Sequence, residues 1–287
     1  MKVRKLIIPV AGYGTRFLPA TKAQPKEMLP VVDKPVVQYI VEEAVKAGIE
    51  DIILVTGSSK RAVEDHFDYN YELQSWLKKQ GKEEQREEIK RIADMANFIY
   101  IRQKGPYGNG TPVLCAEKII GSEPFMVAFG DDLFLGKKKP HLAQLMEVYN
   151  KYGDPVLTAV ETTKEGTSRY GIIDGKEIEP NTFQVNTLVE KPGPEKAPSL
   201  LASIGGYLLT PDIFQVLKNT KLGKGGELWL TDAIATLSKD RPLYARRFEG
   251  EYFDLGSKLG WLQANVTLGL RHEELKKPFS KFLRTLS

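Results

Sequence analysis

The sequence is poor in the residues that build disulfide frameworks and metal centres. Among its 287 residues are one cysteine, Cys115, and three histidines. A single cysteine excludes an internal disulfide and a cysteine-based metal site, and the apolar neighbours of Cys115 predict a buried thiol. The sequence also lacks a Gly-x-Ser-x-Gly nucleophile elbow. None of the histidines lies in a glycine-rich loop, so none is an evident general base; they are His66, His141 and His272.

Long apolar runs and a strong charge bias are missing too. No run approaches membrane-spanning length, and no secretory signal is recognisable, so we expect no membrane partner and a cytoplasmic location. The 41 basic and 37 acidic residues leave a formal net charge of +4, which is too balanced to indicate nucleic acid binding. The chain is long enough to bury a large core, and its 41% hydrophobic content is typical of globular proteins.

The strongest chemical signal lies at residues 6–30, LIIPVAGYGTRFLPATKAQPKEMLP. Residues 6–10 form a short apolar run, typical of a strand that is buried on both faces. Two glycines in the following AGYGTR segment permit a sharp turn and a close approach to a ligand. Arg16 and Lys26 place positive charge beside this turn. The combination predicts a binding site for a polyphosphate.

Two common nucleotide-binding motifs are absent from this segment. It has no Gly-Lys-Ser/Thr ending, so it is not a P-loop. The third glycine of the dinucleotide fingerprint is missing, and the turn runs into Pro19 instead of a long helix. A dinucleotide-dependent oxidoreductase is therefore disfavoured.

The rest of the chain alternates predicted strands and helices. A helix at residues 36–47, between strands at 6–10 and 51–55, predicts a right-handed βαβ unit and an α/β fold. Residues 60–97 predict two amphipathic helices separated by Gly81, either a solvated face or a lid or subunit contact. Residues 170–176 are typical of a hairpin that turns at Asp174-Gly175. Further strands are expected at residues 98–102, 125–129, 155–160, 183–189, 202–209 and 243–248, and the strand at 243–248 is the last clear one. Further helices are expected at residues 112–120 and 140–151, after Pro211 and after Gly226. We expect an amphipathic helix at residues 257–271.

Acidic residues follow two apolar segments that lie far apart in the sequence. Asp131 and Asp132 end the strand at residues 125–129, at the edge where open α/β sheets bind ligands. Asp254 follows Tyr252-Phe253. Such acids also serve as helix caps or turn residues. As ligands, the hard oxygen atoms of Asp131 and Asp254 suit Mg²⁺, with water and phosphate completing the octahedron. Asp132, one position along, is expected to point elsewhere.

Five separated motifs, led by PKEMLP at residues 25–30, resemble the sugar-1-phosphate nucleotidylyltransferases, and the bacterial-type UTP–glucose-1-phosphate uridylyltransferases in particular. Thymidylyl relatives usually have Ser-Lys-Gln where this chain has Pro25-Lys26-Glu27. The resemblance extends from residue 5 to about residue 270. It implies a Rossmann-like nucleotidyltransferase fold with a mixed central sheet flanked by helices, and a homodimer or homotetramer. We expect one catalytic domain at residues 1–270, with a nucleotide-binding half at about 1–135, a sugar-binding half at about 155–256, and a helical tail at 271–287.

The implied reaction joins UTP and glucose 1-phosphate into UDP-glucose and pyrophosphate with the help of Mg²⁺. A sugar phosphate is largely dianionic at pH 7 and is its own nucleophile, so no general base is required. The protein must instead align two polyanions and neutralise charge on the α-phosphate and the departing pyrophosphate. Arg16 and Lys26 are candidates for the triphosphate, and Asp131 and Asp254 for the metal ion.

The resemblance also suggests roles for single residues. Gln103 would recognise uracil, because its carboxamide both donates and accepts hydrogen bonds. Lys191 would bind the sugar phosphate and Glu190 the glucose hydroxyls, and Gly171 would leave room for the ring. Neighbours in a strand point to opposite faces, so Glu190 and Lys191 both reach the sugar only if the strand ends or twists there. The expected catalytic residues are Arg16, Lys26, Asp131 and Lys191; the expected nucleotide-binding residues are Ala11, Gly12, Gly14, Thr15, Arg16, Lys26, Gln103 and Gly108.

The chain departs from the family pattern at three places. Residues 108–112 read GNGTP where the family commonly has GLGHA, Gly206 stands where Arg is frequent, and Trp229 stands where Gln is frequent. The first departure leaves the choice between UTP and dTTP open, so a thymidylyltransferase or another sugar-1-phosphate nucleotidylyltransferase is the main alternative. A non-catalytic ligand-sensing subunit is the second alternative. It is disfavoured because Lys26, Asp131, Lys191 and Asp254 are all present. Sugar range, feedback control and oligomeric state stay open.

Overall fold

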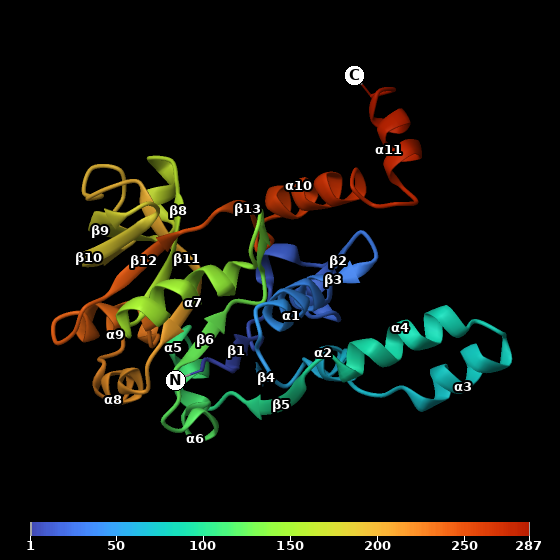
Figure 1. Ribbon diagram of the computed structural model, residues 1–287, viewed down its shortest axis with the longest axis horizontal. Coiled ribbons are helices and arrows are strands. Elements are labelled where there is room, and N and C mark those ends of the chain that lie inside the picture. Colours follow the sequence, from blue (N-terminus) through green and yellow to red (C-terminus); the bar gives the residue numbers. More distant parts are fainter. Residues whose placement is uncertain (1, 287) are drawn as a thin grey trace.

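The computed structural model describes residues 2–286 and is built around a mixed sheet with the strand order β5-β4-β1-β6-β11-β8-β12-β10-β9 (Figure 1). Four strands from the first half of the chain pair in parallel. The apolar runs of three of them, β1, β4 and β6, are buried because helices cover both faces of the sheet, whereas the edge strand β5 is only half-buried. These strands are β1 (Lys5–Pro9), β4 (Asp51–Thr56), β5 (Asn97–Arg102) and β6 (Phe125–Ala128).

The second half of the chain continues the same sheet. β11 (Leu201–Leu209) pairs antiparallel with β6, and all nine of its residues are buried. This strand joins the two halves of the molecule. Beyond it lie β8 (Val156–Glu161), β12 (Tyr244–Arg247), β10 (Thr182–Glu190) and β9 (Gly171–Glu179). The predicted mixed sheet flanked by helices is confirmed, whereas the division into a nucleotide half and a sugar half stays a prediction.

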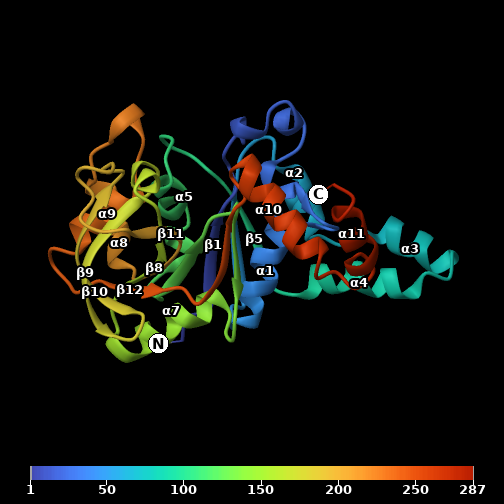
Figure 2. The same ribbon diagram turned by 90° about the horizontal axis from the view of Figure 1, so that it is seen from above.

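Helices occur near the predicted positions. The helix predicted at residues 112–120 is divided at Ala116 into α5 and α6. Gly81 separates α3 from α4, and this helical hairpin extends past the β5 edge of the sheet, away from α8 and α9 (Figure 2). The helices are α1 (Val36–Lys46), α2 (Arg61–His66), α3 (Tyr71–Lys79), α4 (Glu83–Asp94), α5 (Gly110–Cys115), α6 (Glu117–Ile120), α7 (His141–Tyr152), α8 (Asp212–Asn219), α9 (Leu230–Leu237), α10 (Lys258–Gly269) and α11 (Lys276–Leu283).

The predicted hairpin turn at Asp174-Gly175 is wrong. Both residues lie inside β9, opposite an irregularity of the pairing between Val185 and Thr187 in β10. A Cβ on Gly175 would lie 2.7 Å from the Gln184 carbonyl oxygen, so this glycine permits close pairing instead of a turn. The chain reverses after Glu179.

Two short strands were missed because neither has a long apolar run. β7 (Asp132–Gly136) and β13 (Gly250–Asp254) pair antiparallel, so the strand at residues 243–248 is not the last one. Their register places Asp132 opposite Asp254. A small separate sheet thus brings together two acids that lie far apart in the sequence.

The helix predicted at residues 257–271 is present as α10, but it is not amphipathic. In α10 the buried residues are Gly260, Ala264 and Gly269, while Leu259 and Leu262 are exposed. Small residues face the protein because the helix lies close to the backbone; a Cβ on Gly260 would overlap the Asp254 carbonyl oxygen. Cys115, predicted to be buried, is half-buried. Within residues 2–286, no helix combines the length and apolar character needed to cross a membrane.

Candidate active site

The turn after β1 lines a cavity of about 180 Å³. Gly14 has φ 66°, in the left-handed region, and its carbonyl accepts a hydrogen bond of 2.7 Å from the Thr21 hydroxyl. Short 3₁₀ turns at Thr15–Phe17 and Lys26–Met28 follow. Their side chains and those of neighbouring segments surround the cavity, which is lined by Gly14, Thr15, Arg16, Phe17, Lys26, Asp131 and Gly256.

Lys26 and Asp131 form an ion pair inside this cavity. The Lys26 Nζ lies 2.6 Å from the Asp131 Oδ2. Burial opposes the charge on Lys26, but the carboxylates of Asp131 and Glu27 outweigh it and raise the pKa of Lys26. Burial would likewise raise the pKa of Asp131, but Lys26 and Arg16 lower it. Both side chains are therefore charged at neutral pH, as a phosphate or metal site requires.

A second ion pair lies beneath the same turn. The Lys60 Nζ is 2.8 Å from the Glu27 Oε2, and only 3% and 0% of these side chains are exposed. Burial raises the pKa of Glu27, although Lys60 and Lys26 oppose the shift. A Cβ on Gly130 would lie 2.9 Å from the Glu27 Cγ. Close packing against Gly130 and the bond to Lys60 together fix the backbone that carries Lys26.

Asp131 and Asp254 converge on Gly256. A Cβ on Gly256 would lie 2.6 Å from the Asp131 Oδ2 and 3.1 Å from the Asp254 Oδ1. The backbone amide of Gly256 donates a hydrogen bond of 3.0 Å to the Asp254 Oδ1, and Arg169 pairs with the other oxygen of this carboxylate. The two predicted metal ligands thus face one space, which a larger residue at position 256 would fill.

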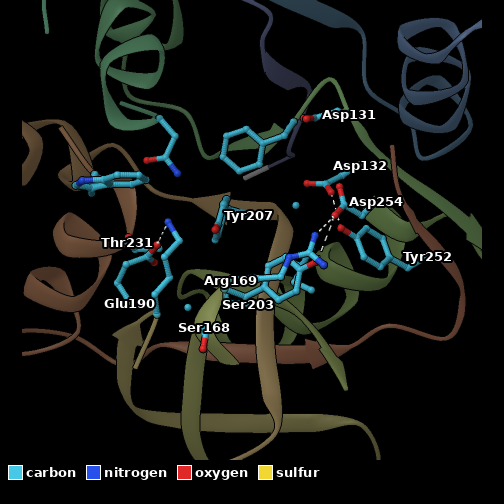
Figure 3. A pocket seen from close by; sticks show the side chains of 18 of the residues that line it. Asp131, Asp132, Ser168, Arg169, Glu190, Ser203, Tyr207, Thr231, Tyr252 and Asp254 are labelled. Carbon is cyan, nitrogen blue, oxygen red and sulfur yellow. Dashed lines mark hydrogen bonds and ion pairs between the residues drawn. The ribbon is translucent and has the colours of Figure 1, made fainter. Parts of the chain in front are cut away.

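Asp132 belongs to the same cluster, against our expectation that it points elsewhere (Figure 3). Its Oδ1 accepts a hydrogen bond of 2.6 Å from the Tyr252 hydroxyl. Burial, together with the charges of Asp131 and Asp254, raises the pKa of Asp132 to about 8. At neutral pH Asp131 is therefore charged, whereas Asp132 favours its protonated form. Among the described residues, no three His, Cys, Asp or Glu side chains form a complete metal site.

A larger cavity of about 470 Å³ adjoins the first and shares Arg16 and Asp131 with it. The acid cluster lies on one side of this cavity and Glu190 and Thr231 on the other (Figure 3). The buried hydroxyl of Thr231, on the wall of this cavity, has no hydrogen-bond partner among the described residues. Further lining residues are Asn109, Phe129, Asp132, Ser168, Arg169, Tyr170, Gly171, Lys191, Ser203, Ile204, Gly205, Tyr207, Trp229, Tyr252 and Asp254.

Glu190 and Lys191 both reach this cavity. β10 ends at Glu190, and Lys191 has φ 46°, which breaks the alternation of the strand. The Lys191 Nζ lies 2.9 Å from the Glu190 Oε1. A Cβ on Gly171 would lie 3.3 Å from the Glu190 Oε2, so the glycine leaves space beside this carboxylate. Because the strand ends at Glu190, the two neighbouring side chains do not point to opposite faces, and both can face the same cavity.

Four predicted nucleotide-binding residues line neither of these two cavities: Ala11, Gly12, Gln103 and Gly108. Gln103 directly follows β5, and its backbone amide donates a hydrogen bond of 2.9 Å to Thr56. A Cβ on Gly108 would lie 2.6 Å from the Leu228 backbone nitrogen. Gly108 therefore has a packing role in this structure: it lets the second glycine-rich loop lie against residue 228.

Sequence reasoning missed several residues of the larger cavity. Arg169 and Tyr252 belong to no motif that marks them. Tyr252 reaches the site because β13 pairs with β7, and Arg169 comes from the segment before β9 and pairs with Asp254. Thr231 lies in a segment that we had interpreted only as the start of a helix, whereas Trp229 in the same segment was noted as a departure from the family pattern. Asn109 was noted as a departure from the family pattern, which was a usable signal.

The second departure, Gly206, has a packing explanation. A Cβ on this residue would overlap the His141 ring and lie 2.7 Å from the Thr158 Oγ1. His141 is buried and bonds Thr158 at 2.6 Å, and burial lowers its pKa to about 3. The space that a side chain at 206 would need is therefore filled by a neutral histidine.

We expect Gly206→Arg to lower the free energy of unfolding by about 3 kcal/mol or more, because it overfills this space and buries a charge. Urea unfolding followed by circular dichroism measures the effect. Adding His141→Ala should recover part of the loss. A single variant that unfolds like the parent protein would contradict the packing explanation.

Comparison with known proteins agrees with this geometry. The family model described as "Nucleotidyl transferase" matches residues 5–269. The chain is 51% identical to UTP–glucose-1-phosphate uridylyltransferase YngB of Bacillus subtilis, over 98% of this chain and 95% of that protein. It resembles the structure of a UTP-bound UGPase from Acinetobacter baumannii, with a TM-score of 0.93, 39% identity and full coverage of both chains. A structure of UDP-glucose pyrophosphorylase complexed with UDP-glucose matches with a TM-score of 0.87 and 43% identity, over 94% of this chain and 100% of that one.

Proposed function

The chain belongs to the nucleotidyl transferase family, and from this premise we propose that it transfers UMP from UTP to glucose 1-phosphate, giving UDP-glucose and pyrophosphate. The observation that carries the proposal is the pair of adjoining cavities that share Arg16 and Asp131. The smaller cavity has the glycine turn and cations that suit a triphosphate. The larger one has Glu190, Lys191 and the free hydroxyl of Thr231, which suit a sugar phosphate.

The residues support an in-line displacement. Lys191 binds the phosphate of glucose 1-phosphate. The Glu190 carboxylate accepts hydrogen bonds from the sugar hydroxyls, and the Thr231 hydroxyl donates one to them. A phosphate oxygen of glucose 1-phosphate attacks the α-phosphorus of UTP. The bond between the α-phosphorus and the oxygen that bridges to the β-phosphorus breaks, and pyrophosphate leaves with the electron pair of that bond. Arg16 and Lys26 hold the triphosphate and neutralise the charge that develops on it. We place Gly14 and Thr15 at the phosphates, and we assign backbone contacts with the nucleotide to Ala11 and Gly12. By packing closely against residue 228, Gly108 would let the second glycine-rich loop approach the base or ribose.

We propose Mg²⁺ as the metal cofactor, held by Asp131 and Asp254. Their oxygens are hard donors, and both lie around the space beside Gly256 that a side chain would fill. Because no third protein ligand completes the described site, phosphates and water would supply the remaining positions. When bound, the ion offers positive charge to the phosphate oxygens. Lys26, paired with Asp131, would keep this carboxylate oriented and charged.

Pyrophosphate release, measured over a matrix of nucleoside triphosphates and sugar 1-phosphates, tests the function. We expect UTP with glucose 1-phosphate to give the highest kcat/KM. A preference for dTTP would support the thymidylyl alternative. No turnover with any pair would support a ligand-sensing protein and end the proposal.

Gln103 is our candidate for the residue that recognises uracil. It directly follows β5, at the edge of the sheet where the turn after β1 also begins. We expect Gln103→Ala to weaken kcat/KM for UTP by about 1–3 kcal/mol, because a polar edge of the base loses its partner. The kinetics of UTP and CTP measure this loss. An unchanged UTP preference would remove Gln103 from the site.

We further propose a homodimer or homotetramer in the cytoplasm, with no nucleic acid or membrane partner. The near-balanced charge supports the absence of nucleic acid, since no large excess of basic residues is available to contact phosphates. Light scattering coupled to size-exclusion chromatography determines the mass of the assembly. A mass that matches one chain at micromolar concentration would contradict the proposed oligomer.

A further inference from the structure

Lys191 is held by two different groups. Its Nζ lies 2.9 Å from the Glu190 Oε1 and 4.5 Å from the centre of the Trp229 ring. The side chain is 42% exposed, so a lysine there would sample many rotamers without such contacts. A carboxylate attracts the ammonium but adds a negative charge that repels a sugar phosphate. An aromatic face attracts it without adding a net charge.

Trp229 is itself fixed in place. A Cβ on Gly223 would lie 2.7 Å from the Trp229 Cδ1, so the indole packs directly against this backbone. Trp229 immediately precedes α9, and the next residue, Leu230, donates its backbone amide to the Asn109 Oδ1 at 2.8 Å. Asn109 and Trp229 both line the larger cavity, and both depart from the family pattern. The two departures thus meet at one place in the structure.

We propose that Trp229 is the positioning residue for Lys191: its ring holds the ammonium in the cavity, ready for the phosphate of the sugar substrate. Asn109 supports the ring by fixing the backbone at the start of α9. This inference rests on the proposed function, because it assigns Lys191 to glucose 1-phosphate. It adds a specific role for a residue that the reaction itself does not require.

The test compares Trp229→Leu with the parent protein by steady-state kinetics. We expect the KM for glucose 1-phosphate to rise about 3- to 30-fold, because the ammonium loses its aromatic partner. The KM for UTP should change less than about twofold, since Trp229 does not line the smaller cavity. Trp229→Phe keeps a ring face and should retain most of the affinity.

A double-mutant cycle with Lys191→Ala separates positioning of Lys191 from an effect that Trp229 exerts on the cavity independently of Lys191. If Trp229 acts through Lys191, Trp229→Leu should change the KM for glucose 1-phosphate by less than about twofold once Lys191 is absent. Trp76→Leu is the matched control, because Lys82 lies 5.4 Å from the ring centre of this half-exposed tryptophan on α3, away from both cavities. It should leave both KM values unchanged.

Two results would overturn the inference. One is an equal rise of both KM values in Trp229→Leu, and the other is an undiminished effect of Trp229→Leu in the Lys191→Ala background. Trp229→Phe with a KM as high as that of Trp229→Leu would count against a role for the ring face. Failure of the proposed function is distinguishable, because the parent protein would then not release pyrophosphate from UTP and glucose 1-phosphate.

Discussion

Asp131→Asn and Asp254→Asn should each lower kcat by about a hundredfold or more. The amide keeps the shape of the side chain but removes the negative charge that a magnesium ligand supplies, and with it part of the charge stabilisation in the transition state. Excess magnesium should restore part of the activity in both variants. Activity measured against magnesium concentration gives both the loss and the restoration.

Thermal melts separate this chemical effect from a loss of structure. Asp254→Asn should melt like the parent protein, because the amide oxygen still accepts the hydrogen bond from the Gly256 backbone and the lost ion pair is with Arg169, which is exposed. Asp131→Asn should be less stable by about 1–2 kcal/mol, since Lys26 loses a charged partner that is only partly exposed. Asp240→Asn, an exposed acid close to a helix end, is the matched control for a turn residue.

Asp132→Asn should be milder than either of these changes. Asp132 bonds the Tyr252 hydroxyl at 2.6 Å, and an amide oxygen accepts the same bond. A magnesium dependence close to that of the parent protein in both Asp131→Asn and Asp254→Asn would end the metal proposal. A loss in Asp132→Asn as large as in Asp131→Asn would instead assign Asp132 to the metal.

Lys191→Ala should raise the KM for glucose 1-phosphate about 10- to 100-fold and change the KM for UTP much less. It removes a charged hydrogen-bond donor from the larger cavity, an effect of about 1.5–3 kcal/mol. Lys191→Arg should recover little, because a planar guanidinium does not fit where a compact ammonium lies between Glu190 and Trp229. Steady-state kinetics with each substrate varied in turn measure both effects.

Lys196→Ala is the matched control for this change, since Lys196 is an exposed lysine of the same loop that lines neither cavity. It should behave like the parent protein. Equal changes in both KM values after Lys191→Ala would indicate a structural role for Lys191, which would then be absent from the sugar phosphate site.

The sequence alone determined the parts of the site that local structure builds. The apolar run at residues 6–10, the glycines after it, and Arg16 and Lys26 predicted a strand that leads into a phosphate cradle. These residues lie close in the chain, and their backbone preferences specify the turn whatever surrounds it. The same holds for the buried strands and for the helices on either side of Gly81, because hydrophobic periodicity is a local property.

Tertiary structure alone decided which distant residues share the site. β7 and β13 carry no strong strand signal, yet their pairing places Asp132 opposite Asp254 and brings Tyr252 to the cavity. Asn109 meets Leu230 although 121 positions separate them. Such contacts depend on sheet register and on close backbone approach at glycines, which arise from packing of the whole chain and leave little trace in any short segment.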